Sequence, residues 1–415
     1  MILNQEVYAT GYEGDNIMGV KRTNRSAALR ILREKGSMSR KRLAEAIKLT
    51  PAAISKIVAE MIGEGLVREG PALPSGGAGR REILVELEPH AGAALGVFLN
   101  LRLAVLSAVW LDGSVIFSEE LPLPPKADAE ETAALLADRL SALLDEYSLP
   151  RELVVGLGLA VRGITSADGR SIVNSFGALK EKNVPLCARL EELTGFPAVL
   201  ANNVRALLAA HMFFAPGDGR GSQFLLRCEY GIGAALSISD RIWPGVTQQC
   251  AEIGHIPVIA RGGKPCSCGK SGCLETIASP GAIREDALAI LSPERTPVLW
   301  KLRQSRGTGE LEIGDVLEAA RSGDAGAAEI VDRAVKALGS ALKSVIYLID
   351  PGKIILYGGM FEDPYYLSRL LSEMREGVDS GHSVIVEKSR YNHRLEDRAA
   401  GLLAVERFFE NGGIR

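Results

Sequence analysis

The residues best suited to chemistry lie together between Glu252 and Glu275, in the segment EIGHIPVIARGGKPCSCGKSGCLE. The segment contains three of the six cysteines of the chain, one of its five histidines and a carboxylate at either end. Thiolates and imidazole are donors that zinc prefers, and four protein ligands leave no position open for water. We therefore predict a structural zinc site, with the ligands His255, Cys266, Cys268 and Cys273.

The alternative is that these cysteines are reduced and buried beside a hydrogen-bonded histidine. The residues between the thiols are polar or glycine, which favours a metal site over a core. Cysteines elsewhere occur singly, so no disulfide framework is expected. The N-terminal residues lack a signal-peptide pattern and no apolar run is long enough to span a bilayer, which predicts a cytoplasmic protein.

Positive charge is concentrated in one part of this 415-residue chain, whose length predicts two or three domains. The net charge is -3, yet residues 21–68 contain twelve Lys or Arg against four Asp or Glu, an excess of eight. Such segregation indicates a basic module that meets a polyanion, joined to an acidic body. A solvated charged face is the alternative.

The basic segment has the pattern of a winged helix-turn-helix. We predict a flexible arm over residues 1–20 and a DNA-binding domain over residues 21–88. Asn24 or Ser26 can cap a first helix, Ser39 a second, and Thr50 followed by Pro51 a third. Two strand-like stretches then flank a hairpin tip, which forms the wing. The expected DNA contacts are Ser39, Arg40, Pro51, Ala52, Ala53, Ser55 and Lys56, with Arg80 and Arg81 at the wing.

The rest of the chain repeats one pattern of strands and helices twice. A three-stranded meander, an amphipathic helix and a buried strand follow residue 89, and a second copy of the theme begins near Ser222. We predict two α/β lobes that face a cleft. The first would span residues 89–205 together with a C-terminal helix over residues 396–415, and the second residues 206–395.

These residues resemble the ROK family, named for repressors, open reading frames and kinases. Family members share Glu-x-Gly-His, present here as Glu252 to His255, and Cys-x-Cys-Gly-x-x-Gly-Cys-x-Glu, present as Cys266 to Glu275. The resemblance implies a two-lobed actin-like ATPase (ribonuclease H-like) fold, and the winged helix resembles the repressor branch. It also implies a polar sugar pocket, in which carboxylates and amides pair with hydroxyls. The corresponding residues are Asn183, Asn202, Asn203, Glu252, His255 and Glu275.

The catalytic positions of the family's kinases are altered. Asn203 stands where these kinases have an aspartate that acts as general base, and an amide cannot take up that proton. The family's first phosphate loop corresponds to Phe98 to Leu103, which has no glycine, carboxylate or hydroxyl. The second corresponds to Glu229 to Gly233, where a carboxylate and a phenol would repel phosphate. We therefore predict that the protein is not an enzyme.

Other departures from the family pattern concern the ligand. Arg162 stands where the family has proline, His211 replaces a glutamate and Gln248 replaces a glycine. An Arg162 that points into the cleft would favour an acidic or phosphorylated sugar, because guanidinium pairs with carboxylate or phosphate. We favour the other interpretation, in which Arg162 is a surface arginine paired with Asp168.

The sequence thus predicts a regulator, expected to be a repressor, that binds operator DNA and senses a sugar or sugar derivative. Because one helix-turn-helix reads few base pairs, we expect a homodimer or a dimer of dimers on a palindromic operator. Three alternatives stay open at this point: a sugar kinase, an adaptor that acts through a protein partner, and a body with a vestigial pocket that only dimerises.

Overall fold

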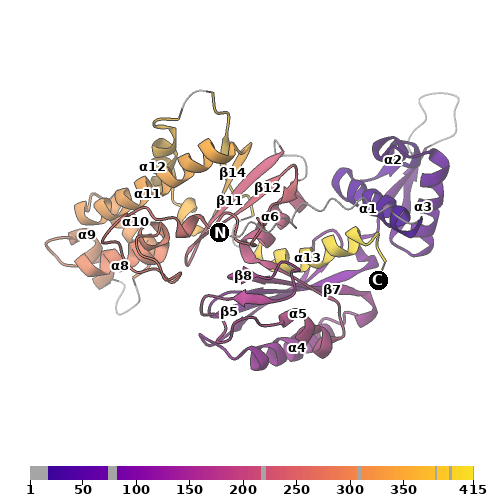
Figure 1. Ribbon diagram of the computed structural model, residues 1–415, viewed down its shortest axis with the longest axis horizontal. Coiled ribbons are helices and arrows are strands. Elements are labelled where there is room, and N and C mark those ends of the chain that lie inside the picture. Colours follow the sequence, from indigo (N-terminus) through magenta and orange to yellow (C-terminus); the bar gives the residue numbers. More distant parts are fainter. Residues whose placement is uncertain are drawn as a thin grey trace, which may run out of the picture.

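The structure is a computed structural model of the 415-residue chain. It describes residues 17–72, 82–215, 221–305, 311–378, 381–391 and 395–414. These residues form a small head and two larger α/β lobes (Figure 1). The predicted fold class is confirmed. No helix in the described ranges is both long and apolar enough to cross a membrane.

The head contains the predicted helix-turn-helix and the two strands that flank the predicted wing tip. Its elements are α1 (Ile17–Lys35), β1 (Met38–Ser39), α2 (Arg40–Ile47), α3 (Pro51–Gly63), β2 (Val67–Ala72) and β3 (Ile83–Leu87). The strands form an antiparallel sheet in the order β1-β3-β2. Ser39 and Thr50 cap α2 and α3 through their side chains, as predicted, and Pro51 lies in the first turn of α3. The apolar stripe of α3 is buried at Ile54, Ile57, Val58 and Met61.

The helix α1 is longer than the sequence indicates. It begins at Ile17, so the predicted arm is wrong for residues 17–20, and Asn24 and Ser26 lie within the helix instead of capping it. Residues 1–16 lie outside the described part. The first turns of α1 pack against the segment that follows residue 410, where a side chain at Gly412 would lie 3.0 Å from the carbonyl oxygen of Arg22. Tertiary packing therefore outweighs the local capping signal.

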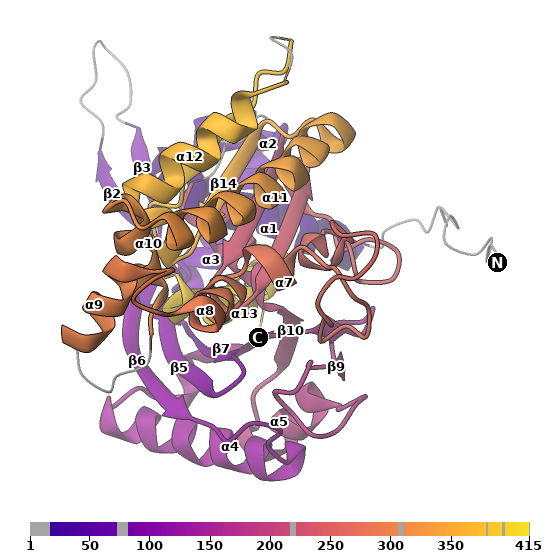
Figure 2. The same ribbon diagram turned by 90° about the vertical axis from the view of Figure 1, so that its left-hand side faces the viewer.

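The N-terminal lobe has a five-stranded sheet in the order β10-β7-β4-β5-β6. Two helices cover its outer face (Figure 2). The elements of this lobe are β4 (Ala93–Leu99), β5 (Leu103–Trp110), β6 (Val115–Pro122), α4 (Ala129–Glu146), β7 (Val154–Val161), the small pair β8 (Ile164–Thr165) and β9 (Ile172–Asn174), α5 (Leu186–Thr194) and β10 (Ala198–Asn202). The meander β4-β5-β6 is antiparallel, whereas β7 and β10 run parallel to β4.

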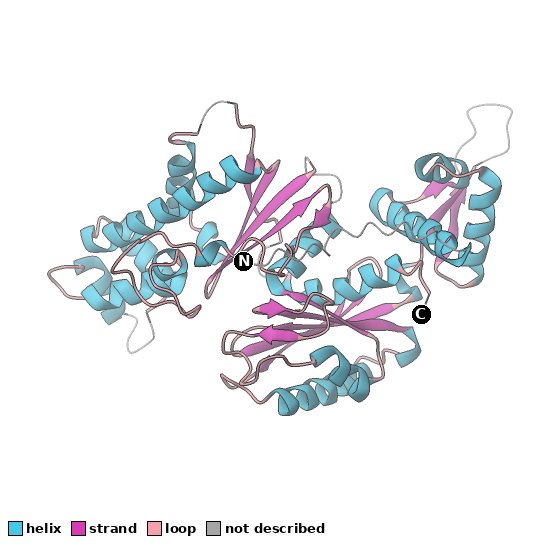
Figure 3. Cartoon of the chain, viewed as in Figure 1, coloured by secondary structure: helices cyan, strands magenta, loops and turns pink. Residues whose placement is uncertain are grey.

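The C-terminal lobe repeats this topology in the order β13-β12-β11-β14-β15. Its strands are β11 (Ser222–Cys228), β12 (Ile232–Ile238), β13 (Arg241–Ile242), β14 (Lys353–Tyr357) and β15 (Ile385–Lys388). Helices pack on its outer side (Figure 3), namely α7 (Glu275–Ala278), α8 (Pro280–Ile290), α9 (Pro297–Ser305), α10 (Ile313–Arg321), α11 (Ala325–Ile349) and α12 (Pro364–Arg375). The predicted duplication of a meander followed by parallel strands is therefore present.

Two helices fill the space between the sheets, α6 (Asn203–Phe214) and α13 (Glu396–Glu410). Their buried side chains belong to the same apolar core as the inner faces of both sheets, and this core continues into the head. Glycines let α13 lie directly on the strands, because a side chain at Gly96 or Gly158 would overlap its main chain. The head is thus joined to the body by packed side chains.

Candidate functional site

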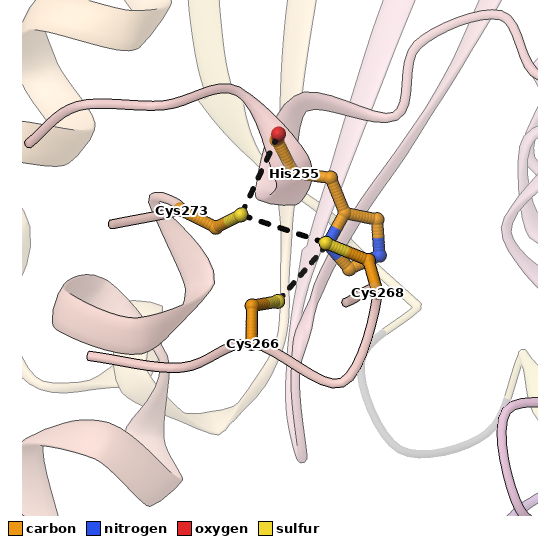
Figure 4. Close-up of side chains that lie close together, drawn as sticks. All are labelled: His255, Cys266, Cys268 and Cys273. Atoms are coloured by element: carbon orange, nitrogen blue, oxygen red, sulfur yellow. Dashed lines mark hydrogen bonds between the residues drawn. The ribbon is translucent and has the colours of Figure 1, made fainter. Parts of the chain in front are cut away.

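The Cys-rich segment folds into a tight loop that brings four potential metal ligands together. Gly269 and Gly272 have φ of +88° and +74°, a conformation that suits glycine, and the main chain closes with a hydrogen bond from Cys266 N–H to Lys270 O at 2.8 Å. His255 comes from a neighbouring 3-10 turn, Ile253–His255. The ligand atoms of His255, Cys266, Cys268 and Cys273 all lie within 4.8 Å of one another (Figure 4).

The donor set and its spacing fit a tetrahedral metal ion. Zinc–ligand bonds of about 2.0–2.3 Å place tetrahedral donors about 3.5–3.8 Å apart. Cys266 Sγ lies 3.5 Å from His255 Nδ1, and Cys268 Sγ lies 3.6 Å from Cys273 Sγ. Burial lowers the pKa of His255, as do Lys270 and Arg162, against the opposing charge of Glu275. The imidazole is therefore favoured in the neutral form that can bind a metal.

A cavity between the two lobes collects most of the predicted sugar-binding residues. Its enclosed volume is about 70 Å³, which is below the usual range for small-molecule sites, and its open mouth brings the empty space to about 670 Å³. The N-terminal lobe and α6 contribute Asn202 and Asn203, and the C-terminal lobe contributes Glu252, His255 and Glu275. His255 thus lies both in the Cys cluster and on the cavity wall.

The two asparagines at the start of α6 differ in what they can offer a ligand. Asn202 caps the helix, since its Oδ1 accepts hydrogen bonds from Val204 and Arg205 N–H, and its Nδ2 donates to Gly163 O at 2.9 Å. Asn203 is 4% exposed, and within the described residues its amide has no hydrogen-bond partner. Asn203 is therefore better placed than Asn202 to bind a ligand hydroxyl.

The two glutamates of the cavity differ in their surroundings. Glu275 Oε2 accepts a hydrogen bond from Ile232 N–H at 2.9 Å, and Gly231 leaves the room that this approach requires. Burial raises the pKa of Glu252, against the opposing charge of Arg205. Arg205 itself is buried in α6 and bonds to Gln248 Oε1 at 2.6 Å. Gln248 therefore serves to anchor a loop to α6.

Two of the residues singled out by sequence lie elsewhere. Asn183 is in a turn with φ of +54°, where its N–H donates to Val173 O, and it is not among the described residues that line the cavity. His211 is 2% exposed within α6, about two turns from the cavity end of that helix. The assignment of Asn183 to the ligand rested on the family resemblance alone.

Sequence reasoning missed Asn100 and Arg227, which also line the cavity. Asn100 follows β4 directly, and polar groups at the carboxyl ends of sheet strands often bind ligands. Arg227 lies in the otherwise apolar strand β11 and forms an ion pair with Glu396 at 2.6 Å. A charged residue inside an apolar strand was the available signal for Arg227.

Arg162 lies at the cavity and not on the outer surface. It lines this cavity and an adjoining one, and in the described part of the chain its guanidinium has no ion-pair partner. The predicted pairing with Asp168 is wrong, because Asp168 instead bonds to Ser166 Oγ and Arg170 N–H. An unpaired arginine is therefore available to a ligand anion.

The positions where phosphate loops were expected contain other side chains. Phe98 is fully buried in β4, so it fills space as predicted. Glu229 Oε1 accepts a hydrogen bond from Gly359 N–H at 3.0 Å, and Tyr230 is 71% exposed at the edge of both cavities. Gly231 lies in the turn between β11 and β12, so it serves a tight turn between two strands.

Many basic residues of the head form ion pairs within the protein, so fewer of them are available to contact DNA. Arginines of α1 pair with acidic residues of α3 and α13. Ser39 is 2% exposed, so its DNA assignment is wrong: the hydroxyl caps α2, and Arg40 pairs with Glu69. The exposed cations without ion-pair partners among the described head residues include Lys41, Arg42, Lys48 and Lys56.

The outer face of α3 agrees with the sequence analysis. Pro51, Ala52, Ser55 and Lys56 are exposed and Ala53 is half-buried. Lys41, Arg42 and Lys48 lie on or beside α2, and sequence reasoning missed them because their helix face was not assigned. Arg80 and Arg81 lie outside the described residues. The head therefore presents small side chains on one helix with unpaired cations beside them.

These features define a class of protein: a winged-helix head packed on a two-lobed α/β body, with a polar cavity between the lobes and a Cys3His cluster beside it. The chain belongs to the ROK family, whose model matches residues 105–403. A second model, of the MarR family, matches residues 24–69 within the head.

Known proteins of both kinds, regulators and kinases, are similar to the chain. The DNA-binding transcriptional dual regulator NagC of Escherichia coli (strain K12) is 29% identical over 350 residues, 84% of this chain and 83% of NagC. A glucokinase of Halalkalibacterium halodurans is 30% identical over 248 residues, 60% of this chain and 74% of the kinase. A solved ROK family transcriptional regulator, a homologue of the E. coli MLC protein, has a TM-score of 0.79 at 23% identity and covers 95% of this chain, with 97% of its own length matched. That last likeness shows the fold.

Proposed function

We propose that this protein is a transcription repressor whose affinity for operator DNA changes when its body binds a sugar or sugar derivative. The observation that carries the proposal is the direct packing of a helix-turn-helix, with unpaired cations on its outer face, onto a body with a polar inter-lobe cavity. The similarity to NagC, a DNA-binding transcriptional regulator, supports it over most of both chains.

The head would bind the duplex through α3. The small side chains Ala52 and Ser55 let the helix approach the floor of a major groove, where Ser55 and Lys56 reach base edges or phosphates. Lys41 and Lys48 are placed to neutralise phosphates on either side. Two heads related by a two-fold axis would then read two half-sites, so we propose a homodimer on a palindromic operator.

The cavity would bind the effector through hydroxyl-pairing groups from both lobes. Asn203, Glu252, Glu275 and His255 offer donors and acceptors that suit the hydroxyls of a sugar ring. Arg162 adds a cation without a partner among the described residues, which suits an effector with a carboxylate or phosphate group. The effector that we propose is therefore a sugar that carries a negative charge.

The Cys3His cluster would hold a structural zinc ion. His255 and the three cysteines supply four ligands, which leaves no coordination position for substrate or water. The loop around the cysteines has little apolar core of its own, so the ion would fix its fold and the position of His255 on the cavity wall.

Phosphoryl transfer is not part of the proposal. Asn203 is an amide at the cavity end of α6 and cannot accept the proton of an attacking hydroxyl. Phe98 provides no metal-binding carboxylate, and the carboxylate of Glu229 would repel a phosphate group. The similarity to a glucokinase makes a sugar kinase the second candidate.

One set of assays separates the candidates. A DNA duplex selected from a random pool by the purified protein is titrated at several salt concentrations, with and without glucose, N-acetylglucosamine and their 6-phosphates. We expect salt-dependent binding that at least one sugar alters. ATP-dependent phosphorylation of any of these sugars, lost in an Asn203→Ala variant, would contradict the proposal in favour of a kinase.

A further inference from the structure

One helix runs from the inter-lobe cavity to the DNA-binding head. The first residue of α6, Asn203, lines the cavity, and Phe213 lies near its other end. A helix of 12 residues is roughly 18 Å long, so α6 bridges the two regions directly. In Figure 1 it lies beside α13, which extends toward α1 of the head.

Arg33 of the head contacts both of these helices. Its guanidinium lies over the ring of Phe213 on α6, 4.4 Å from the ring centroid, and it also pairs with Glu406 of α13. Its side chain is only 10% exposed, so both contacts are largely shielded from water. Cation–π and ionic contacts of this kind become stronger when water is excluded.

The two helices are attached to the body in different ways. The helix α13 packs directly on the sheet of the N-terminal lobe, where Gly96 and Gly158 allow contact with its main chain, and it reaches the C-terminal lobe at its first residue, where Glu396 pairs with Arg227. The helix α6 also touches the C-terminal lobe, since a side chain at Gly233 of β12 would lie 2.9 Å from Val204. A ligand that draws the lobes together would therefore act on α6 more than on α13.

We propose that Arg33 is a positioning residue that couples the effector cavity to the orientation of the head. Because it contacts both helices, a shift of α6 relative to α13 changes the contacts of Arg33. This inference rests on the proposed function and adds the route by which the signal travels. When the effector binds at Asn203, α6 shifts, and the ring of Phe213 moves relative to the guanidinium of Arg33. The head, whose core is continuous with this junction, is then reoriented.

The test uses two substitutions at the junction and a matched control. Arg33→Met removes the charge, and Phe213→Leu removes only the aromatic face. The control is Arg30→Gln: Arg30 lies on the same helix and pairs with the same Glu406, but its side chain is 40% exposed. Operator affinity is measured for the full chain with and without each of the four sugar probes, and sugar affinity and melting temperature are measured separately.

Substitutions on a coupling route change the coupling by about 2- to 30-fold. We expect Arg33→Met and Phe213→Leu to reduce the sugar-induced change in operator Kd by at least about threefold, with sugar affinity unchanged, and Arg30→Gln to keep the wild-type response. A full response in both junction variants would overturn this inference alone. A wild type that binds DNA and sugar independently, with no coupling, would overturn the inference and the sugar response of the proposed function together. A wild type that binds no DNA would overturn both through the head.

Discussion

Replacing Arg25 of α1 should loosen the head from the body. Arg25 is 1% exposed, although it is a charged residue. Its Nε donates to Gly412 O at 2.7 Å, beyond α13, and its Nη1 donates to Glu64 Oε1 at 2.8 Å, at the end of the recognition helix α3. One buried guanidinium therefore ties the helix that would read DNA to the segment that follows the last described helix of the body.

The cost of an Arg25→Met substitution can be estimated from these contacts. A buried Gly412 carbonyl oxygen without a donor costs about 1–3 kcal/mol. The Glu64 side chain is 47% exposed, so its screened pair contributes only about 0.5–1 kcal/mol. Methionine replaces most of the apolar stem, so little packing is lost. We expect the free energy of unfolding of the head to fall by roughly 1.5–4 kcal/mol.

The measurement is urea denaturation of the full chain, followed by circular dichroism, together with operator binding. The control is Arg22→Met, an exposed arginine on the same helix. We expect an early transition and weaker operator binding in the Arg25 variant only. An Arg25→Met protein that unfolds within about 0.5 kcal/mol of the wild type, as surface substitutions do, would refute the reasoning.

Four further outcomes are expected. Purified protein should contain about one zinc ion per chain, and Cys268→Ser should bring this below about half an ion and lower the melting temperature. Combined Lys41→Ala and Lys56→Ala changes should weaken DNA binding and reduce the salt slope by about 1.8 per head. Arg162→Gln should abolish a preference for 6-phosphorylated over neutral sugars, measured by calorimetry. Burial raises the pKa of Glu252, so the native state binds this proton more tightly than the unfolded state does. The buried carboxylate therefore lowers the stability of the native state as pH rises above about 4.5. Glu252→Gln should consequently raise the melting temperature more at pH 8 than at pH 4.

The first three of these predictions have a matched control, and all four have a contrary result. Cys250→Ser should keep the zinc, and Lys336→Ala, on α11, should keep the salt slope. Arg162→Lys should retain part of the preference for phosphate, because it keeps the charge. The zinc prediction would be contradicted by a fully stable wild type without metal, and the DNA prediction by an unchanged salt slope in the double variant. Equal affinities of the wild type for neutral and charged sugars would contradict the prediction for Arg162. An effect of Glu252→Gln that does not change with pH would contradict the last prediction.

Much of the fold followed from local signals in the sequence. The apolar period of Ile54, Ile57, Val58 and Met61, with Thr50 and Pro51 before it, identified α3 and its buried face. Such signals depend only on neighbours in the chain. The start of α1 did not follow, because its first turns are stabilised by Gly412, almost four hundred residues away in the sequence.

The candidate site was predicted where a motif placed several residues in one loop, and less well where distant elements meet. His255 and the cysteines do converge, and Asn203, Glu252 and Glu275 share one cavity. Other features depend on how distant parts of the chain pack together. These are the positions of Arg227 and Arg162 on the cavity wall and the ion pairs between α1 and α13. Periodicity does not encode that packing.

The most direct test of the account is the operator affinity of the full-length protein, measured by fluorescence anisotropy as each sugar probe is added. The account predicts that a sugar changes the operator Kd by at least about fivefold, and that Asn203→Ala abolishes the change while DNA binding without sugar persists. An operator Kd that none of the probes alters, in a protein that binds one of them in the cavity, would contradict it.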